Sequence, residues 1–175
     1  SFKNVATTGV VLAEDGSKMS KSKGNYTDPL LNVDVFGADA LRFYMMESVV
    51  MQAEDMKFSD LELREMHNRV VNILWNTYRF YEPYKDEYKD EYKPEDSTNV
   101  LDQWILAKLE ESSKVITESL EDYNTVKASR EIRDFITEFS TWYIRRSRDR
   151  FRESNGEDRL YVISTTYFVL LTFSK

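Results

Sequence analysis

The sequence contains no cysteine and only one histidine, five glycines and three prolines among its 175 residues. The absence of cysteine excludes disulfide bonds, thiolate zinc sites and cysteine nucleophiles, and it suits a reducing compartment such as the cytoplasm. The single histidine, His67, lies on a helical pattern without partner ligands, so we predict no metal site. No apolar run approaches the roughly 18–20 residues that a membrane-spanning helix needs, and we expect no membrane partner.

Acidic residues outnumber basic ones, 31 to 24, so any contact with nucleic acid must come from a local basic patch. Hydrophobic residues make up 41% of the chain, which indicates a folded protein. Four of the five glycines precede residue 40. We therefore predict loops and short elements in the first quarter of the chain and long helices in the rest, which together make a mainly α fold.

Local patterns predict the positions of these elements. Residues 10–12 suggest a strand that ends in a tight turn at Asp15 and Gly16, residues 38–49 a helix, and residues 50–58 an extended connector. Four helices follow, beginning after Ser59 (which forms a capping-box pattern with Glu62), near Asn99, near Asn124 and near residue 158. The last carries no stop signal, so we expect the chain to end inside a helix of a longer protein.

Residues 82–96 read EPYKDEYKDEYKPED, a near-perfect four-residue repeat. On a helix, Tyr84, Tyr88 and Tyr92 would share one face and could form an aromatic recognition strip. We favour the alternative that the segment is a solvated acidic connector between helices.

Residues 18–25 read KMSKSKGN and carry three lysines and two serines without an acidic residue. Lysine ammonium groups, hydroxyls and backbone N–H groups next to a glycine suit a polyphosphate ligand, although such a loop is also compatible with simple solvation. The pattern is not a Walker A loop.

Residues 141–152 contain five arginines and one aspartate. On a helix, Arg145, Arg148 and Arg152 project along one side, with Arg146 and Arg150 on an adjoining one. Arginines in this arrangement can bind phosphates, or they can pair with acidic residues inside the fold. For Trp142 and Tyr143 we favour packing in the helical core, since they continue an apolar stripe.

Residues 18–22 match KMSKS, the second signature of class I aminoacyl-tRNA synthetases, without a substitution. The following KGNYTDP and FGADALRFYMM resemble the segment after KMSKS in the isoleucine, valine and leucine members. FSTWYIRRSRDRF resembles the anticodon-binding helix of the isoleucine members. This resemblance implies the end of a class I catalytic core, with a short α/β KMSKS segment, over residues 1–57, and an incomplete α-helical anticodon-binding bundle over residues 58–175.

The resemblance also implies an activity. The loop would close over ATP while isoleucine attacks the α-phosphate, with Lys21 as the main catalytic lysine, Lys18 assisting, and Mg²⁺ supplied with the rest of the enzyme. tRNA(Ile) would be the macromolecular partner, and a chain without a HIGH-type motif should be inactive alone. The implied ATP-binding residues are Lys18, Met19, Ser20, Lys21 and Ser22, and the implied tRNA-binding residues are Trp142, Arg145, Arg146, Arg148 and Arg150.

Three alternatives stay open at this point. The chain can belong to another member of the class, the valine enzyme first. It can also be a non-catalytic helical RNA-binding module whose lysine loop is only electrostatic, or a purely structural bundle.

Overall fold

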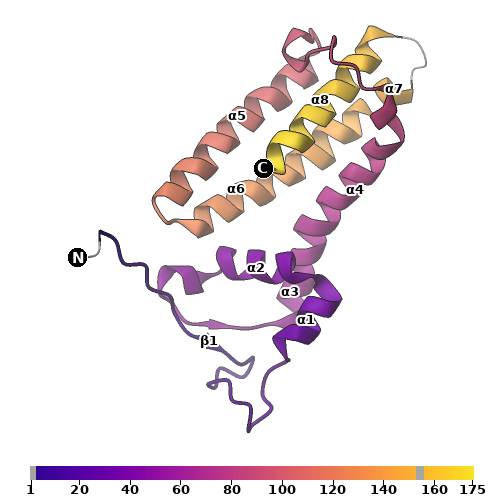
Figure 1. Ribbon diagram of the computed structural model, residues 1–175. Helices are drawn as coiled ribbons and strands as arrows, with labels where there is room; N and C mark the ends of the chain where they lie inside the picture. The colour runs from indigo at the N-terminus through magenta and orange to yellow at the C-terminus, as the bar shows by residue number, and fades with distance from the viewer. Residues whose placement is uncertain (1–2, 153–155) are drawn as a thin grey trace. The chain divides into compact units, whose positions relative to one another are not determined.

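The computed structural model describes residues 3–152 and 156–175, and the chain forms two compact units. The first unit comprises residues 1–71 and 116–132, and the second comprises residues 72–115 and 133–175. Helices dominate both units (Figure 1), which confirms the predicted mainly α fold. The domain boundary expected after residue 57 stays a prediction.

The first unit contains one short parallel strand pair and a series of short helices. Val11 in β1 pairs with Met56 in β2, and Leu12 pairs with Lys57. The elements that belong wholly to this unit are β1 (Val11–Leu12), α1 (Pro29–Phe36), α2 (Ala38–Glu47), the 3-10 turn η1 (Val49–Gln52), β2 (Met56–Lys57), α3 (Asp60–Met66) and the π-helical segment η2 (His67–Val71).

Two elements of the first unit differ from the sequence-based expectation. Helix α1 lies where no helix is predicted from the sequence; Asp28 caps it by accepting a hydrogen bond from the Leu30 amide, and Pro29 occupies its first turn. The predicted extended connector over residues 50–58 instead contains part of η1 and strand β2. Ser59 caps α3 as expected, accepting from the Glu62 amide at 3.4 Å.

The second unit is a helical bundle. Its elements are α4 (Asn72–Tyr81), the 3-10 turns η3 (Glu82–Glu87) and η4 (Pro94–Asp96), most of α5 (Val100–Glu121), the end of α6 (Thr125–Glu138), the π-helical segment η5 (Phe139–Ile144), α7 (Arg145–Arg152) and α8 (Glu157–Phe173). The helix starts expected near Asn99, Asn124 and residue 158 are confirmed.

Aromatic rings fill the core of the second unit. Phe135, Phe139 and Tyr143 stack in sequence, with ring centroids 6.1 Å and 5.8 Å apart. Each such side chain contributes roughly 1.5–3 kcal/mol through burial. Buried residues of α5 and α8, including Ile105 and Val162, complete the core. The unit therefore has its own hydrophobic centre.

The tyrosine repeat behaves differently from both interpretations of its sequence. Tyr84 and Tyr88 pack against the core of the second unit, and the Tyr92 ring meets Tyr161 edge-on at 5.3 Å. The segment forms 3-10 turns and loops instead of a continuous α-helix, so the three rings do not share a helical face. The expected solvated acidic connector describes most of the charged side chains of this segment, which are exposed, but it is wrong for the three rings, which bury apolar surface.

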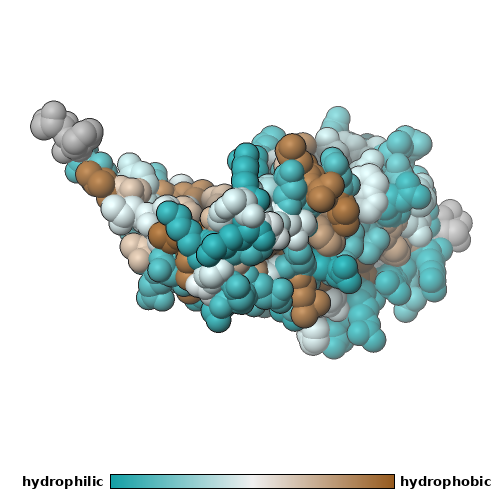
Figure 2. Space-filling model, turned by 90° about the horizontal axis from the view of Figure 1, so that it is seen from below, coloured by the Kyte–Doolittle hydropathy of each residue, from teal (hydrophilic) through white to brown (hydrophobic). Residues whose placement is uncertain are grey.

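Among residues 3–152 and 156–175, no helix combines the length and apolar character that crossing a membrane requires. Hydrophilic residues cover most of the face shown in Figure 2, and apolar side chains lie between them. The exposed apolar residues of the first unit include Leu30, Leu31 and Val35 of α1.

Candidate phosphate-binding loop and nucleic-acid interface

A tight turn after β1 positions the lysine-rich segment. The Gly16 amide donates to the Ala13 carbonyl at 2.8 Å, and Gly16 adopts φ +81°, a conformation that favours glycine. Asp15 accepts a hydrogen bond from the Ser17 amide at 2.8 Å, which lowers the pKa of its carboxyl. An isolated bridge from Leu12 to Lys18 then joins the start of the KMSKS loop to the strand. The tight turn and this bridge therefore fix the position of the backbone where the loop begins.

The loop (residues 18–25) is closed by hydrogen bonds of its own. The amides of Lys23 and Gly24 both donate to the Ser20 carbonyl at 3.1 Å, and Gly24 adopts φ +58°. The hydroxyls of Ser20 and Ser22 lie 2.8 Å apart. The side chain of Asn25 contacts three groups of the segment, namely the Ser20 amide at 2.9 Å, the Ser17 hydroxyl at 2.8 Å and the Lys18 carbonyl at 3.2 Å.

The three lysines of the loop are exposed. In the described part of the chain, Lys18, Lys21 and Lys23 form no ion pair with an acidic side chain. Three ammonium groups on an ordered turn create a local positive potential within an acidic chain, which favours a phosphate-bearing ligand. Of the other predicted ATP-binding residues, Ser22 is exposed, while Met19 and Ser20 are half-buried.

A cavity of 280 Å³ lies beside this loop. Its lining includes Met19, Gly24, Asn25, Phe58 and Asp60. Asp60 accepts hydrogen bonds from the Thr27 hydroxyl at 2.6 Å and from the side-chain Nδ2 of Asn32 at 3.0 Å, so it holds the segment that follows the loop. In the described ranges, no cluster of three or more His, Cys, Asp or Glu side chains is arranged to hold a metal ion.

Sequence reasoning missed Asn25 and Asp60. Asn25 follows Gly24, and asparagine after glycine is a turn signal. That signal reveals the turn but not the partners of the side chain. The contacts of Asp60 depend on residues 28 and 33 positions away, which no local pattern contains.

The arginine-rich segment begins in the π-helical segment η5 and continues through α7. Tyr143 is fully buried, as expected, but Trp142 is 47% exposed. The π-helical turn carries one more residue than an α-helical turn, so it shifts the register between the apolar stripe and the exposed face. The guanidinium of Arg146 lies 3.7 Å from the centre of the Trp142 ring, a cation–π contact.

The five predicted tRNA-binding residues do not share one environment. Arg145, Arg146 and Arg148 are exposed and lie on one helix with the exposed Trp142. Arg148 also lies over the Phe80 ring at 5.8 Å. Together these four side chains offer charge and an aromatic face to a nucleic acid. Arg150, by contrast, is only 9% exposed.

Arg150 is held by two aspartates inside the second unit. It donates two hydrogen bonds to Asp102, at 2.8 and 2.7 Å, and two more to Asp158, both at 2.7 Å. Burial alone would lower the pKa of Arg150, but its hydrogen bonds to Asp102 and Asp158 outweigh burial and raise it. The alternative that some arginines are internal ion-pair partners therefore holds for Arg150, whose guanidinium is occupied and not presented to a phosphate.

Asp102 is the centre of this buried cluster. Besides Arg150, it accepts hydrogen bonds from the Tyr143 hydroxyl at 2.7 Å and the Ser97 hydroxyl at 2.6 Å. Four donors thus satisfy the four lone-pair sites of one carboxylate. Burial and the neighbouring Asp102 charge raise the pKa of Tyr143 well above its ordinary value, so it donates as a neutral phenol.

Asp158 makes the second unit sensitive to acid. Hydrogen bonds from Arg150 lower the pKa of its carboxyl below the ordinary value of 3.8. Between these two values the unfolded chain binds more protons than the folded chain, so stability falls as pH decreases through that range. We expect Asp158→Asn to flatten this decline below about pH 4, in urea unfolding measured over a pH series. An unchanged decline in the variant would contradict this role.

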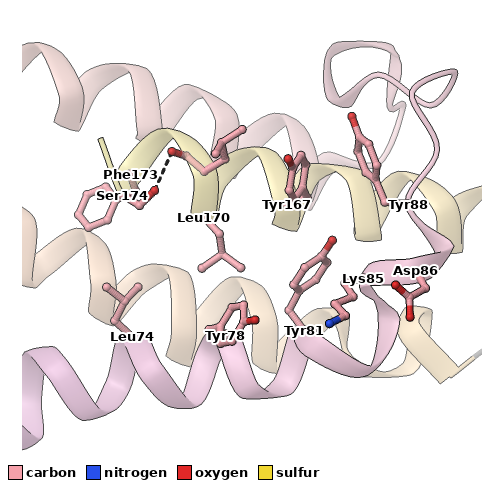
Figure 3. Close-up of a pocket in the computed structure, with 11 residues that line it drawn as sticks. Leu74, Tyr78, Tyr81, Lys85, Asp86, Tyr88, Tyr167, Leu170, Phe173 and Ser174 are labelled. Carbon is pink, nitrogen blue, oxygen red and sulfur yellow. Dashed lines mark hydrogen bonds between the residues drawn. The ribbon is translucent and has the colours of Figure 1, made fainter.

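The second unit also contains an apolar groove of 620 Å³ between α4, η3 and α8 (Figure 3). Its side chains include Tyr78, Tyr81, Tyr88 and Tyr167, and Leu170 lies beside them. Burial raises the pKa of Tyr81 to about 12, so its hydroxyl stays protonated near neutral pH. Most of the groove is lined by aromatic rings and aliphatic groups, and Lys85, Asp86 and Ser174 also line it.

Two family models match separate parts of the chain. Residues 1–59 match the class I tRNA synthetases (I, L, M and V), and residues 102–175 match the anticodon-binding domain of tRNA ligase. The first match contains the KMSKS loop, and the second contains the whole arginine-rich segment. The candidate phosphate-binding loop thus lies in the synthetase match, and the candidate nucleic-acid interface lies in the anticodon-binding match.

Curated relatives and a solved structure agree with these matches. The isoleucine–tRNA ligases of Chlamydia trachomatis and Chlamydia muridarum are 42% identical over 179 aligned residues, covering 99% of this chain and 17% of each relative. The chain therefore spans about a sixth of the length of these relatives. The LeuRS of Agrobacterium radiobacter, in a ternary complex with tRNA and LeuAMS, shares the fold with a TM-score of 0.68 at 20% identity, covering 95% of this chain and 20% of that one. Over 99% of its length the chain is therefore similar to isoleucine–tRNA ligases, with one segment that matches the class I tRNA synthetases and another that matches the anticodon-binding domain of tRNA ligase.

Proposed function

We propose that this chain is the part of an isoleucine–tRNA ligase that stabilises the pyrophosphate leaving ATP and that binds tRNA(Ile). The observation that carries the proposal is the KMSKS loop, which presents the exposed ammonium groups of Lys18 and Lys21 on an ordered turn. The similarity to isoleucine–tRNA ligases over 99% of the chain supports isoleucine as the amino acid. The cysteine-free composition suits the cytoplasm.

The chemistry of the loop follows from charge. A carboxylate oxygen of isoleucine attacks the α-phosphorus of ATP, and the bond from that phosphorus to the bridging oxygen breaks. Negative charge then grows on the departing pyrophosphate. Lysine ammonium groups stabilise this charge most strongly in the transition state, where it develops. Lys21 contributes most of this stabilisation and Lys18 assists. Met19, Ser20 and Ser22 shape the turn, and the two serines also supply hydroxyls.

The resemblance to class I synthetases also implies Mg²⁺. Among the residues that the structure describes, no group of three or more His, Cys, Asp or Glu side chains is arranged to hold a metal ion, and we propose that Mg²⁺ is bound with the rest of the enzyme. In this segment we assign phosphate stabilisation chiefly to Lys21 and Lys18. The test of this half of the proposal is ATP–pyrophosphate exchange by a complete isoleucine–tRNA ligase that carries this segment, with Lys18 and Lys21 replaced.

The arginine-rich surface is proposed to bind tRNA through Arg145, Arg146, Arg148 and Trp142. Replacing both Arg145 and Arg148 with alanine is expected to weaken binding of a tRNA(Ile) transcript. The slope of log K against log salt should fall by about 0.7–0.9 for each lost phosphate contact, since fewer counterions are released. Binding is measured at several salt concentrations by fluorescence anisotropy.

Arg79 provides the matched control, because it is exposed but already paired with Glu82 at 3.1 Å. Arg79→Ala should leave the salt slope unchanged. If the double variant Arg145→Ala/Arg148→Ala also kept the original slope, these arginines would not contact the RNA backbone.

A further inference from the structure

Asn25 joins the two ends of the KMSKS loop with a single side chain. Its Oδ1 accepts from the Ser20 amide, while its Nδ2 donates to the Ser17 hydroxyl and to the Lys18 carbonyl. The three distances lie between 2.8 and 3.2 Å. An asparagine amide offers two N–H donors and one carbonyl acceptor, so this geometry uses all of its polar groups.

The backbone turn brings Asn25 to this position. Gly24 adopts φ +58°, which turns the chain back so that Asn25 faces Ser20. The Ser20 carbonyl meanwhile accepts from the amides of Lys23 and Gly24. Ser20 is therefore held through its N–H by Asn25 and through its C=O by the turn, which fixes the backbone immediately before Lys21.

We propose that Asn25 is a positioning residue that holds the KMSKS loop in order before ATP binds. This inference rests on the proposed function of the loop. A lysine whose backbone is already fixed loses less conformational freedom when it meets the pyrophosphate, so more of its electrostatic contribution reaches the transition state. The Asn25 side chain acts on the loop through its hydrogen bonds to Ser17, Lys18 and Ser20.

Two substitutions separate the contributions of the Asn25 amide. Asn25→Ala removes all three hydrogen bonds. Asn25→Asp keeps an acceptor for the Ser20 amide but has no donor for the Ser17 hydroxyl or the Lys18 carbonyl. We expect both variants to loosen the loop, with Asn25→Ala giving the larger effect.

Hydrogen exchange on the 175-residue chain tests the order of the loop directly. In Asn25→Ala the Ser20 amide should exchange about tenfold faster, because it loses its acceptor. The amides of α2 serve as an internal reference and should keep their protection. Asn4→Ala, the same change at an exposed asparagine, should change neither set. Unchanged exchange at Ser20 would overturn the proposal, and so would an equal loss of protection in α2, since Asn25 would then support the whole unit.

ATP–pyrophosphate exchange in a complete ligase that carries this segment tests the consequence. Asn25→Ala should lower kcat about tenfold while the KM for ATP changes less than about twofold, because the variant loses stabilisation of the transition state and not binding of ATP. Normal exchange by Asn25→Ala beside slow exchange by Lys21→Ala would overturn the positioning role and leave the proposed function standing. Normal exchange by Lys21→Ala would instead reject the proposed function, whatever the order of the loop.

Discussion

Asp102→Ala is expected to lower the free energy of unfolding of the second unit by about 3–5 kcal/mol. The substitution removes a fully buried carboxylate that accepts four hydrogen bonds. The Arg150 charge then keeps only Asp158 as a partner, and the Tyr143 hydroxyl loses its acceptor. Removing one partner of a buried charge and the acceptor of a buried hydroxyl costs more than the intact pair contributes.

Urea unfolding followed by tryptophan fluorescence measures this loss. Trp75, Trp104 and Trp142 all belong to the second unit, so the signal reports on that unit. Glu110→Ala, a change at an exposed acidic residue of the same helix, should alter stability by less than about 0.5 kcal/mol. An effect of Asp102→Ala as small as that control would contradict the assignment.

A double variant shows what the ion pair itself contributes. In Asp102→Leu/Arg150→Met neither charge is left alone, so the unit should recover part of the stability that Asp102→Ala loses. Asp158 then keeps its hydrogen bond from Asn99 and its contact with water. The interaction energy from the complete cycle of single and double variants isolates the coupling between Asp102 and Arg150.

Local signals in the sequence were sufficient to place most of the helices. Ser59, Asn99 and Asn124 mark helix starts because their side chains accept hydrogen bonds from amides of the first turn. Such bonds link residues two or three positions apart, so they are visible in a short window. Asp28 and Pro29 are a comparable signal for the start of α1, a helix that the expectations from the sequence did not include.

Features that depend on distant partners could not be predicted. Strand β2 exists because Met56 meets Val11, which lies 45 residues earlier. The exposure of Trp142 depends on a π-helical turn that a strict 3.6-residue period does not contain.

The arginines show the same limit within one helix. Arg148 and Arg150 are two residues apart in the same charge run, yet the first is exposed and the second buried. The difference comes from Asp102, 48 residues away, and from Asp158 across the α7–α8 connection. The family resemblance identified the segment, but only the three-dimensional structure shows which of its arginines are exposed and which are buried in ion pairs.

Replacing Lys21 with alanine in a complete isoleucine–tRNA ligase that carries this segment is expected to slow ATP–pyrophosphate exchange at least tenfold. Replacing Lys18 as well should bring the loss to about 10²–10³-fold, since each ammonium contributes a charge-assisted contact to the leaving pyrophosphate. Both side chains are exposed and unpaired among the described residues, so their removal should leave the unfolding free energy within about 0.5 kcal/mol of the original.

Two comparisons decide whether this loss comes from the loop. Lys3→Ala removes an exposed lysine outside the KMSKS segment and should leave exchange unchanged, which excludes a general effect of net charge. Lys21→Arg keeps the charge but replaces a compact ammonium with a planar guanidinium, so it should restore only part of the rate. A rate for Lys18→Ala/Lys21→Ala equal to that of Lys3→Ala would mean that the loop lysines do not stabilise the leaving group, and the positive charge of the turn would then be only a solvated surface feature.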